Sequence, residues 1–235
     1  MFINLWSSPR NVSTALMYAF AQRADMQVFD EPFYAHYLKY TGAQRPDRKV
    51  TLESMECDSE KILTSIINHT SQKHTFLKNI SVQLIGLDDA FIGKTQNIIL
   101  IRNPKDTLLS YTKVIDQPTI DDIGFKHQCD IYNKWHKKGN INCIVNSMDI
   151  LKNPKLMLTK ICNSLNIEFD PNMLTWEKGP RPEDGPWAKY WYASVHNSTG
   201  FMPYKLNITE LPSHLKALYD ECLPYYEFLN NLKIS

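Results

Sequence analysis

Two segments of this sequence place an arginine and hydroxyl side chains where a strand meets a helix, which is one way to build a site for an anion. In one of them, Arg102 directly follows an apolar run over residues 98–101. Pro104 comes next but one, and Ser110 lies eight residues beyond the arginine. The apolar run is typical of a buried strand, proline is favoured in the first turn of a helix, and Ser110 falls about two turns along that helix. The pattern therefore predicts an anion site that the arginine and the serine share.

A second site of the same kind begins the chain. Residues 2–6 predict a strand, residues 15–22 predict a helix, and a polar turn over residues 7–14 joins them. Backbone N–H groups at a helix N-terminus attract an anion, the helix dipole adds roughly half a positive charge, and an arginine adds a full one. The residues of this turn that we expect at the anion are Ser8, Arg10, Asn11, Val12, Ser13 and Thr14. Two such sites indicate a ligand with two separate phosphate-like groups.

Length, charge and cysteine content limit the other classes of function. A chain of 235 residues with a net charge of +1 predicts one α/β domain over residues 1–235, with no reason to bind nucleic acid or an anionic membrane. No run approaches the roughly 18 apolar residues of a membrane span, and the first strand leaves no room for a signal peptide, so we expect a cytoplasmic protein. Five cysteines without paired spacing, and histidines without ligand spacing, indicate neither disulfides nor a metal site.

Strands that alternate with helices along the chain predict a parallel sheet. Further strands are expected over residues 26–29, 74–77 and 141–145. A helical stretch is expected from Phe33 to Tyr40, and longer helices over residues 59–71, 80–91, 104–114, 120–138, 154–165 and 212–230. Residues 42–52 predict a loop. Residues 176–204 are rich in Pro, Gly, Trp and Tyr and predict an irregular segment, which in a compact domain is usually functional.

The carboxyl ends of the predicted strands carry charged side chains. Glu31 follows the second strand and Lys78 ends the third. Together with Arg10 and Arg102 they form a cationic rim with one acid along the sheet edge where α/β proteins bind ligands, and this arrangement suits group transfer. His36 lies about one helical turn beyond Glu31, within reach of the same pocket.

These segments resemble those of sulfotransferases. The turn over residues 8–14 is similar to their 5′-phosphosulfate loop, and Arg102 with Pro104 and Ser110 resembles their 3′-phosphate site. Residues 179–201 resemble a bacterial branch of sulfotransferase-like proteins. The resemblance implies a three-layer α/β fold with a central parallel sheet, similar to P-loop nucleotide triphosphatases. It also implies 3′-phosphoadenosine 5′-phosphosulfate (PAPS) as co-substrate, adenosine 3′,5′-bisphosphate (PAP) as product, and no metal.

The resemblance implies roles for single residues as well. The 5′ end of the nucleotide is expected at Arg10, Ser13 and Thr14. The 3′-phosphate is expected at Arg102 and Ser110. The irregular segment over residues 176–204 is expected to cover the nucleotide, with contacts from Arg181 and Gly200.

The expected chemistry follows the logic of phosphoryl transfer. A hydroxyl or amine of a small-molecule acceptor attacks sulfur in line, while negative charge builds on the bridging oxygen of the leaving nucleotide. We expect Arg10 and Lys78 to meet that charge, and Glu31 to take the proton of the acceptor. A carboxylate base needs desolvation to raise its pKa, which a closed pocket provides. No histidine follows Lys78, so Glu31 or His36 is the expected base.

Two other functions fit part of the pattern. A P-loop kinase shares the strand–loop–helix start, but its loop reads Gly-x-x-x-x-Gly-Lys-Ser/Thr, whereas this turn has no glycine and Arg102 stands where a metal-binding acid is expected. A non-catalytic nucleotide-binding protein of the same fold would also lack the histidine. The acceptor and the oligomeric state, a homodimer included, stay open. An aromatic-walled pocket for the acceptor is suggested by Tyr34, Tyr37, Tyr40, Trp187, Tyr190, Trp191 and Tyr192.

Overall fold

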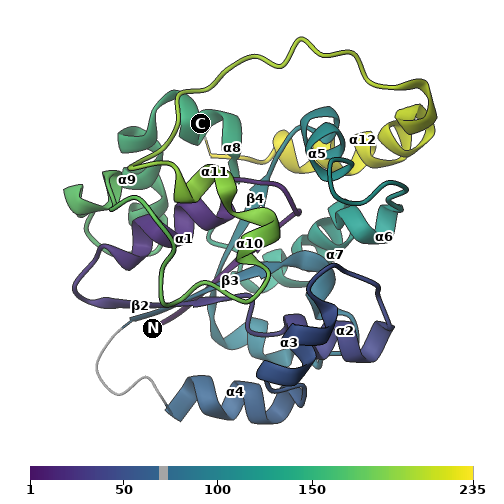
Figure 1. Ribbon diagram of the computed structural model, residues 1–235. Helices are drawn as coiled ribbons and strands as arrows, with labels where there is room; N and C mark the ends of the chain where they lie inside the picture. The colour runs from purple at the N-terminus through teal and green to yellow at the C-terminus, as the bar shows by residue number, and fades with distance from the viewer. Residues whose placement is uncertain (69–73, 235) are drawn as a thin grey trace.

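A five-stranded parallel sheet forms the centre of the computed structural model, which describes residues 1–68 and 74–234 (Figure 1). Its strands are β1 (Phe2–Ser7), β2 (Met26–Asp30), β3 (His74–Ile80), β4 (Gln96–Ile101) and β5 (Cys143–Asn146). They lie side by side in the order β2-β3-β1-β4-β5, and all of them pair in parallel. The carboxyl ends therefore meet at one edge, with β1 between β3 and β4.

Helices cover both faces of this sheet. The α-helices are α1 (Ser13–Ala21), α2 (Tyr34–Thr41), α3 (Arg48–Ser54), α4 (Ser59–Asn68), α5 (Pro104–Tyr111), α6 (Ile120–Ile123), α7 (Phe125–Trp135), α8 (Ser147–Lys152), α9 (Pro154–Ser164), α10 (Ala188–Trp191), α11 (Ala193–His196) and α12 (Lys216–Asn230). Short 3₁₀ helices are η1 (Ser81–Leu84), η2 (Asp89–Lys94), η3 (His136–Lys138), η4 (Pro171–Leu174) and η5 (Ser213–Leu215). In the described residues, no helix has the length and apolarity needed to cross a bilayer.

Successive strand residues point to opposite faces of the sheet and contribute to an apolar layer on each face. On one face, Ile3 and Leu5 of β1 pack against α1, α8 and α9. On the other face, Trp6 of β1 and Ile99 of β4 pack against α7 and α12. Strands buried on both sides are expected of a parallel sheet, and each buried aliphatic side chain contributes roughly 1.5–3 kcal/mol relative to exposure. The three-layer α/β fold predicted from the sequence is confirmed.

The connection from β4 to α5 shows why the strand-to-helix turns form where they do. The Asn103 side chain accepts a hydrogen bond from the backbone N–H of Lys105 and so caps α5, and Pro104 occupies the first helical position. Asn146 caps α8 in the same way at the end of β5. These local signals fix where each helix begins and therefore which side chains reach the carboxyl edge of the sheet.

Several predicted elements differ from those observed. The helix expected over residues 80–91 was wrong, because β3 continues to Ile80 and two 3₁₀ helices follow it. The loop expected over residues 42–52 contains the start of α3. The helix expected over 120–138 is broken at Gly124, whose φ of +77° ends α6 before α7 begins. The end expected at residue 71 for the helix that begins at residue 59 lies outside the described residues.

Candidate active site

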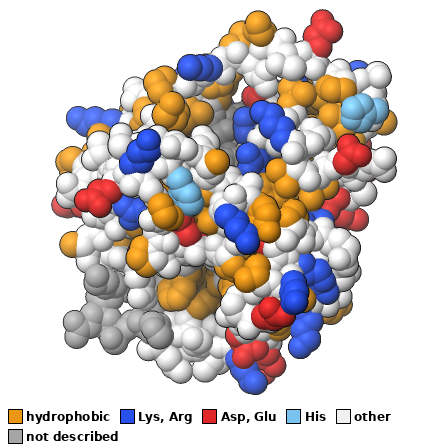
Figure 2. All heavy atoms as spheres, in the orientation of Figure 1, with side chains coloured by type: hydrophobic (Ala, Val, Ile, Leu, Met, Phe, Trp, Pro, Cys, Tyr) orange, Lys and Arg blue, Asp and Glu red, His pale blue; other side chains and the backbone are white. Residues whose placement is uncertain are grey.

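A cavity of about 480 Å³ opens at the carboxyl edge of the sheet, and each of the five strand ends contributes to its wall. Figure 2 shows this face hollowed beside a group of Lys and Arg side chains. The residues predicted at the site that line the cavity are Arg10, Asn11, Val12, Ser13, Thr14, Glu31, Lys78, Arg102, Ser110 and Gly200. The structure thus gathers most of the predicted residues around one space.

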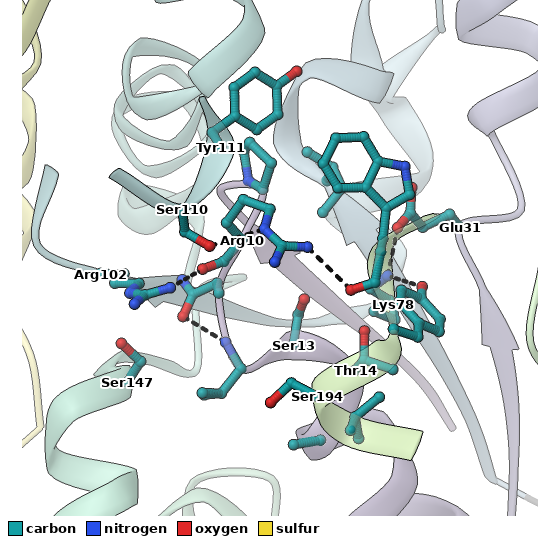
Figure 3. Close-up of a pocket in the computed structure, with 18 of the residues that line it drawn as sticks. Arg10, Ser13, Thr14, Glu31, Lys78, Arg102, Ser110, Tyr111, Ser147 and Ser194 are labelled. Carbon is teal, nitrogen blue, oxygen red and sulfur yellow. Dashed lines mark hydrogen bonds and ion pairs between the residues drawn. The ribbon is translucent and has the colours of Figure 1, made fainter. Parts of the chain in front are cut away.

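Arg10 and Arg102 lie next to each other at the ends of β1 and β4 (Figure 3). Arg10 Nε donates to Ser110 Oγ at 3.0 Å, and Arg10 Nη1 donates to the carbonyl oxygen of Trp191 at 3.0 Å. Arg102 Nη1 donates to the carbonyl oxygen of Arg10. The two predicted anion segments are therefore joined, since the arginine of the first reaches the serine of the second.

Neither Arg10 nor Arg102 has an acidic partner among the described residues. In the part of the chain that the structure describes, no ion pair joins Arg10 or Arg102 to a carboxylate. Burial and the neighbouring charge of Arg102 lower the pKa of Arg10, and burial lowers the pKa of Arg102. Arginine stays protonated in proteins even so. The β1–β4 side of the cavity therefore carries two positive charges that are not ion-paired in the described residues, and it favours an anion.

The turn after β1 is held in a strained shape. Among the described residues, three non-glycine positions have a left-handed backbone, and Arg10 (φ +56°) and Glu31 (φ +45°) are the two that line the cavity. The Asn11 side chain fixes the turn, because its Oδ1 accepts from Val12 N at 2.9 Å and its Nδ2 donates to the Leu100 carbonyl at 3.1 Å. Such strain concentrates at functional sites.

The first turn of α1 faces the cavity without a side-chain cap. Val12 occupies the N-cap position and offers no side-chain hydrogen bond, while Ser13 and Thr14 line the cavity. Uncapped N–H groups and the positive end of the helix dipole are suited to an oxyanion. This part of the predicted first site therefore has the donors that it needs.

Lys78 occupies a very different environment on β3. Its ammonium group donates to Asp30 Oδ1 at 3.0 Å, to Glu31 Oε1, and to the hydroxyl oxygen of Tyr192 at 2.6 Å. The lysine is only 1% exposed, and both carboxylates are buried as well. We expected a cation free to meet a ligand, whereas the structure shows one whose three N–H groups are all engaged.

The pKa values at this cluster follow from burial and pairing. Burial raises the pKa of Glu31, although the Lys78 charge opposes the rise. Burial alone would lower the pKa of Lys78, but Asp30 and Glu31 together outweigh it and the pKa is raised. Glu31 Oε2 also accepts a hydrogen bond from Gln83 Nε2 at 2.5 Å. Desolvation of the carboxylate, which a base at this position needs, is therefore present.

Residues 184–202, called the covering segment below, close the cavity from above the sheet. Its Asp184 accepts hydrogen bonds from the Tyr18 hydroxyl of α1 at 2.7 and 2.8 Å, and His196 Nε2 lies 2.8 Å from the same carboxylate. The backbone N–H of Gly185 donates to Asp30 Oδ2 at 3.1 Å. A Cβ atom at Gly185 would lie 2.1 Å from the Trp187 ring, so no side chain fits there. The covering segment thus lies over the cavity, and its predicted contact with a nucleotide stays a prediction.

Sequence reasoning missed how Asp30 and Tyr192 complete the surroundings of Lys78. Tyr192 lies 114 residues from the lysine, and no spacing rule connects them. Asp30 stands directly before Glu31 at the end of β2, so the pair of adjacent acids was the one local signal that could have indicated a buried ion pair. Of the aromatic residues suggested for a pocket, those that line the cavity are Tyr34, Tyr37, Trp187, Trp191 and Tyr192.

Three predicted site residues lie elsewhere. His36 Nδ1 is hydrogen-bonded to the carbonyl oxygen of Cys57 at 3.0 Å, and its ring stacks on Tyr40, away from the cavity wall. Ser8 is fully buried under the turn and accepts from Asn11 Nδ2 at 3.4 Å. The Arg181 guanidinium lies over the ring of Tyr18 at 4.8 Å. None of the three is among the residues that form the cavity wall in the described structure.

Comparison with known proteins gives one family for nearly the whole chain. A family model described as a sulfotransferase domain matches residues 1–232. Two curated relatives from Arabidopsis thaliana, branched-chain-amino-acid aminotransferase-like proteins 1 and 2, are each 40% identical to it over 97% of its length. The chain spans 41% of the length of each of these relatives.

Solved structures share the fold at low sequence identity. A sulfotransferase from Alicyclobacillus acidocaldarius superposes with a TM-score of 0.57 at 10% identity, covering 98% of this chain and 96% of that one. The sulfotransferase domain from the curacin biosynthetic pathway gives a TM-score of 0.55 at 12% identity, covering 93% and 96%. At these identities the likeness concerns the arrangement of the elements.

Proposed function

The chain belongs to the sulfotransferase domain family, and on this premise we propose that it transfers a sulfuryl group from PAPS to a hydroxyl or amine of a small-molecule acceptor. One observation carries the proposal. Arg10 and Arg102 line one cavity at adjacent strand ends with no carboxylate partner in the described residues, and Ser110 lines the same cavity and accepts a hydrogen bond from Arg10. Positive charge that is partly withdrawn from water and has no partner is costly unless an anion binds there.

The donors present suit a nucleotide with two anionic ends. Arg102 and Ser110 would hold the 3′-phosphate, as charge-assisted hydrogen bonds to arginine favour phosphate oxygens. The uncapped first turn of α1, with Ser13 and Thr14, would hold the 5′ end. Arg10 lies between these places and would contact the group that is transferred.

The acid cluster supplies the proton chemistry of the proposal. As the acceptor oxygen attacks sulfur, an S–O bond forms to the acceptor, the S–O bond to the nucleotide breaks, and the acceptor loses a proton. Glu31 would take this proton, since burial raises its pKa and its side chain lines the cavity. The cations nearest to the leaving oxygen would be Arg10 and Lys78, which meet the charge that builds there.

The remaining wall of the cavity indicates the body of the acceptor. Tyr34 and Trp187 pack edge to face with ring centroids 4.9 Å apart, and Tyr111 stacks on Trp191 at 5.9 Å. The Arg45 charge in this wall is paired with Asp122 and is therefore cancelled. An acceptor with an apolar or aromatic body and no net charge fits this side.

Ligand binding followed by transfer tests the proposal. We expect PAP to raise the melting temperature of the protein, and magnesium-ATP to raise it less, because only PAP offers a separate 3′-phosphate to Arg102. Transfer from PAPS is then assayed on a panel of alcohols, phenols, sugars and amines. Stabilisation by magnesium-ATP without stabilisation by PAP would favour the P-loop kinase instead, and tight PAP binding without transfer to any acceptor would favour a non-catalytic protein.

A further inference from the structure

The ammonium group of Lys78 has no free hydrogen to offer a ligand in this structure. A lysine has three N–H donors, and Asp30, Glu31 and Tyr192 accept one each. The side chain is 2% exposed, so water does not supply a further partner. For Lys78 to contact an anion in the cavity, one of these three acceptors has to give way.

The three acceptors differ in how readily they can be exchanged. Asp30 and Glu31 are carboxylates with side chains 0% and 9% exposed, and removing a cation from a buried carboxylate leaves a charge unpaired. The Tyr192 oxygen is neutral, and burial raises its pKa well above the ordinary value, so it stays neutral. Exchange at Tyr192 therefore costs least.

The Tyr192 hydroxyl keeps other partners when the lysine leaves. It donates to Asp30 Oδ2 at 2.8 Å and accepts from Trp187 Nε1 at 2.9 Å. No buried polar atom of Tyr192 is then left without a partner, which is the condition for a low-cost exchange.

We propose that Tyr192 is a positioning residue whose hydroxyl holds the third N–H of Lys78 and yields it to an oxygen at the 5′ end of the bound nucleotide. This inference rests on the proposed function. Trp191, the residue before it, holds the other cation, because its carbonyl accepts from Arg10 and its ring lies 5.3 Å from that guanidinium. Consecutive residues of the covering segment thus restrain both cations of the transfer site.

Two nucleotides that differ only at the 5′ end test this role in Tyr192→Phe. PAP carries the 5′-phosphate that would displace the hydroxyl, whereas adenosine 3′-monophosphate lacks it. We expect the variant to bind PAP at least about 10-fold more tightly than the wild type, which is the lower end of the range for one hydrogen bond to a charged group. The dissociation constant for adenosine 3′-monophosphate stays within about twofold, because that ligand does not need Lys78.

The matched control is Tyr190→Phe. Tyr190 lies in helix α10, two residues before Tyr192, which follows that helix. Its side chain is 40% exposed and does not line the cavity, so loss of its hydroxyl leaves both dissociation constants unchanged. If Tyr192→Phe weakened the binding of both nucleotides equally, the role of Tyr192 would be merely structural and the inference would be overturned. An unchanged ratio of the two constants would overturn it as well.

A measurement on the wild type covers the case in which Tyr192→Phe does not fold. Backbone hydrogen–deuterium exchange of residues 187–192 is measured in two samples, one with PAP and one with adenosine 3′-monophosphate. We expect faster exchange in the PAP complex than in the adenosine 3′-monophosphate complex. Equal exchange with the two ligands contradicts the inference. Failure of the wild type to bind either nucleotide would instead overturn the proposed function, and with it this inference, so the two failures are told apart.

Discussion

The two halves of the carboxyl edge treat buried positive charge in opposite ways. At the ends of β1 and β4, Arg10 and Arg102 have no carboxylate partner in the described residues. At the ends of β2 and β3, Lys78 is enclosed by Asp30 and Glu31. In the first half the positive charge is available to a ligand. In the second half the positive charge of Lys78 is already neutralised by carboxylates of the protein. A cation at a strand end therefore indicates ligand binding only when its neighbours leave it unpaired.

The largest expected effect is on stability and comes from the paired half. Lys78→Met leaves Asp30 and Glu31 buried without a cation, and we expect the free energy of unfolding to fall by about 3–5 kcal/mol. Denaturant unfolding measures it. The double variant Lys78→Met/Glu31→Gln is the control and should recover part of the loss, because one of the unpaired charges is gone. A loss below about 1 kcal/mol in the single variant would remove the contrast between the two halves.

Replacement of a cation by methionine in the unpaired half is expected to act on nucleotide binding rather than on stability. Arg102→Met should weaken PAP binding roughly 100-fold, as expected for loss of a charge-assisted contact to phosphate. The free energy of unfolding should fall by no more than about 1 kcal/mol, since only its hydrogen bond to the Arg10 carbonyl is lost. Calorimetric titration and denaturant unfolding give the two values. Unchanged PAP affinity would show that this half is not the phosphate site.

The pH dependence of the free energy of unfolding distinguishes the contribution of Glu31 from the contributions of its neighbours. Because burial raises its pKa above the ordinary 4.5, the folded chain binds this proton more tightly than the unfolded chain does. The Glu31 contribution is therefore full below pH 4.5 and is lost as the pH rises through the folded-state pKa, with a slope of at most about 1.4 kcal/mol per pH unit. Glu31→Gln should lack this fall when unfolding is measured from pH 4 upward. An identical profile in both proteins would contradict the assignment.

The smallest expected effect concerns the backbone of the unpaired half. Arg10 has a φ of +56°, which alanine adopts at a cost and glycine does not. Arg10→Gly should therefore be more stable than Arg10→Ala by about 1 kcal/mol, while both lose the same contact to the nucleotide. Thermal unfolding compares the variants. A more stable Arg10→Ala would mean that the turn changes its shape when the guanidinium is removed.

Most of the fold could be predicted because its signals are local. Apolar runs marked the strands, and Asn-Pro pairs at 103–104 and 153–154 marked helix starts where the structure has caps. Residues 80–91 failed because their apolar spacing resembles a helix, whereas the backbone forms two 3₁₀ turns around Gly86, whose φ is +81°. Tertiary packing decided that segment, and the sequence pattern alone does not show it.

The site was predicted less completely than the fold. Residues directly at strand ends line one cavity, since parallel strands bring their carboxyl ends together, and their contacts with a ligand stay a prediction. The pairing of Lys78 was not predicted, because it depends on contacts with residues 47 and 114 positions away. His36 was expected within reach from helical spacing alone, but its ring points to the Cys57 carbonyl instead. Sequence spacing shows which side chains can reach a site, whereas the direction in which a side chain points is set by contacts with residues remote in the sequence.

The missing side chain at Gly185 has a consequence for what keeps the charged cluster away from water. All five strands lie within residues 2–146, so Asp30, Glu31 and Lys78 can meet while still hydrated. They become dry only when the tight bend at Gly185 lets Trp187 and Tyr192 dock onto them from a remote part of the chain. The dry surroundings of the charged cluster therefore depend on the covering segment, and the bend at residue 185 is what lets that segment reach the cluster.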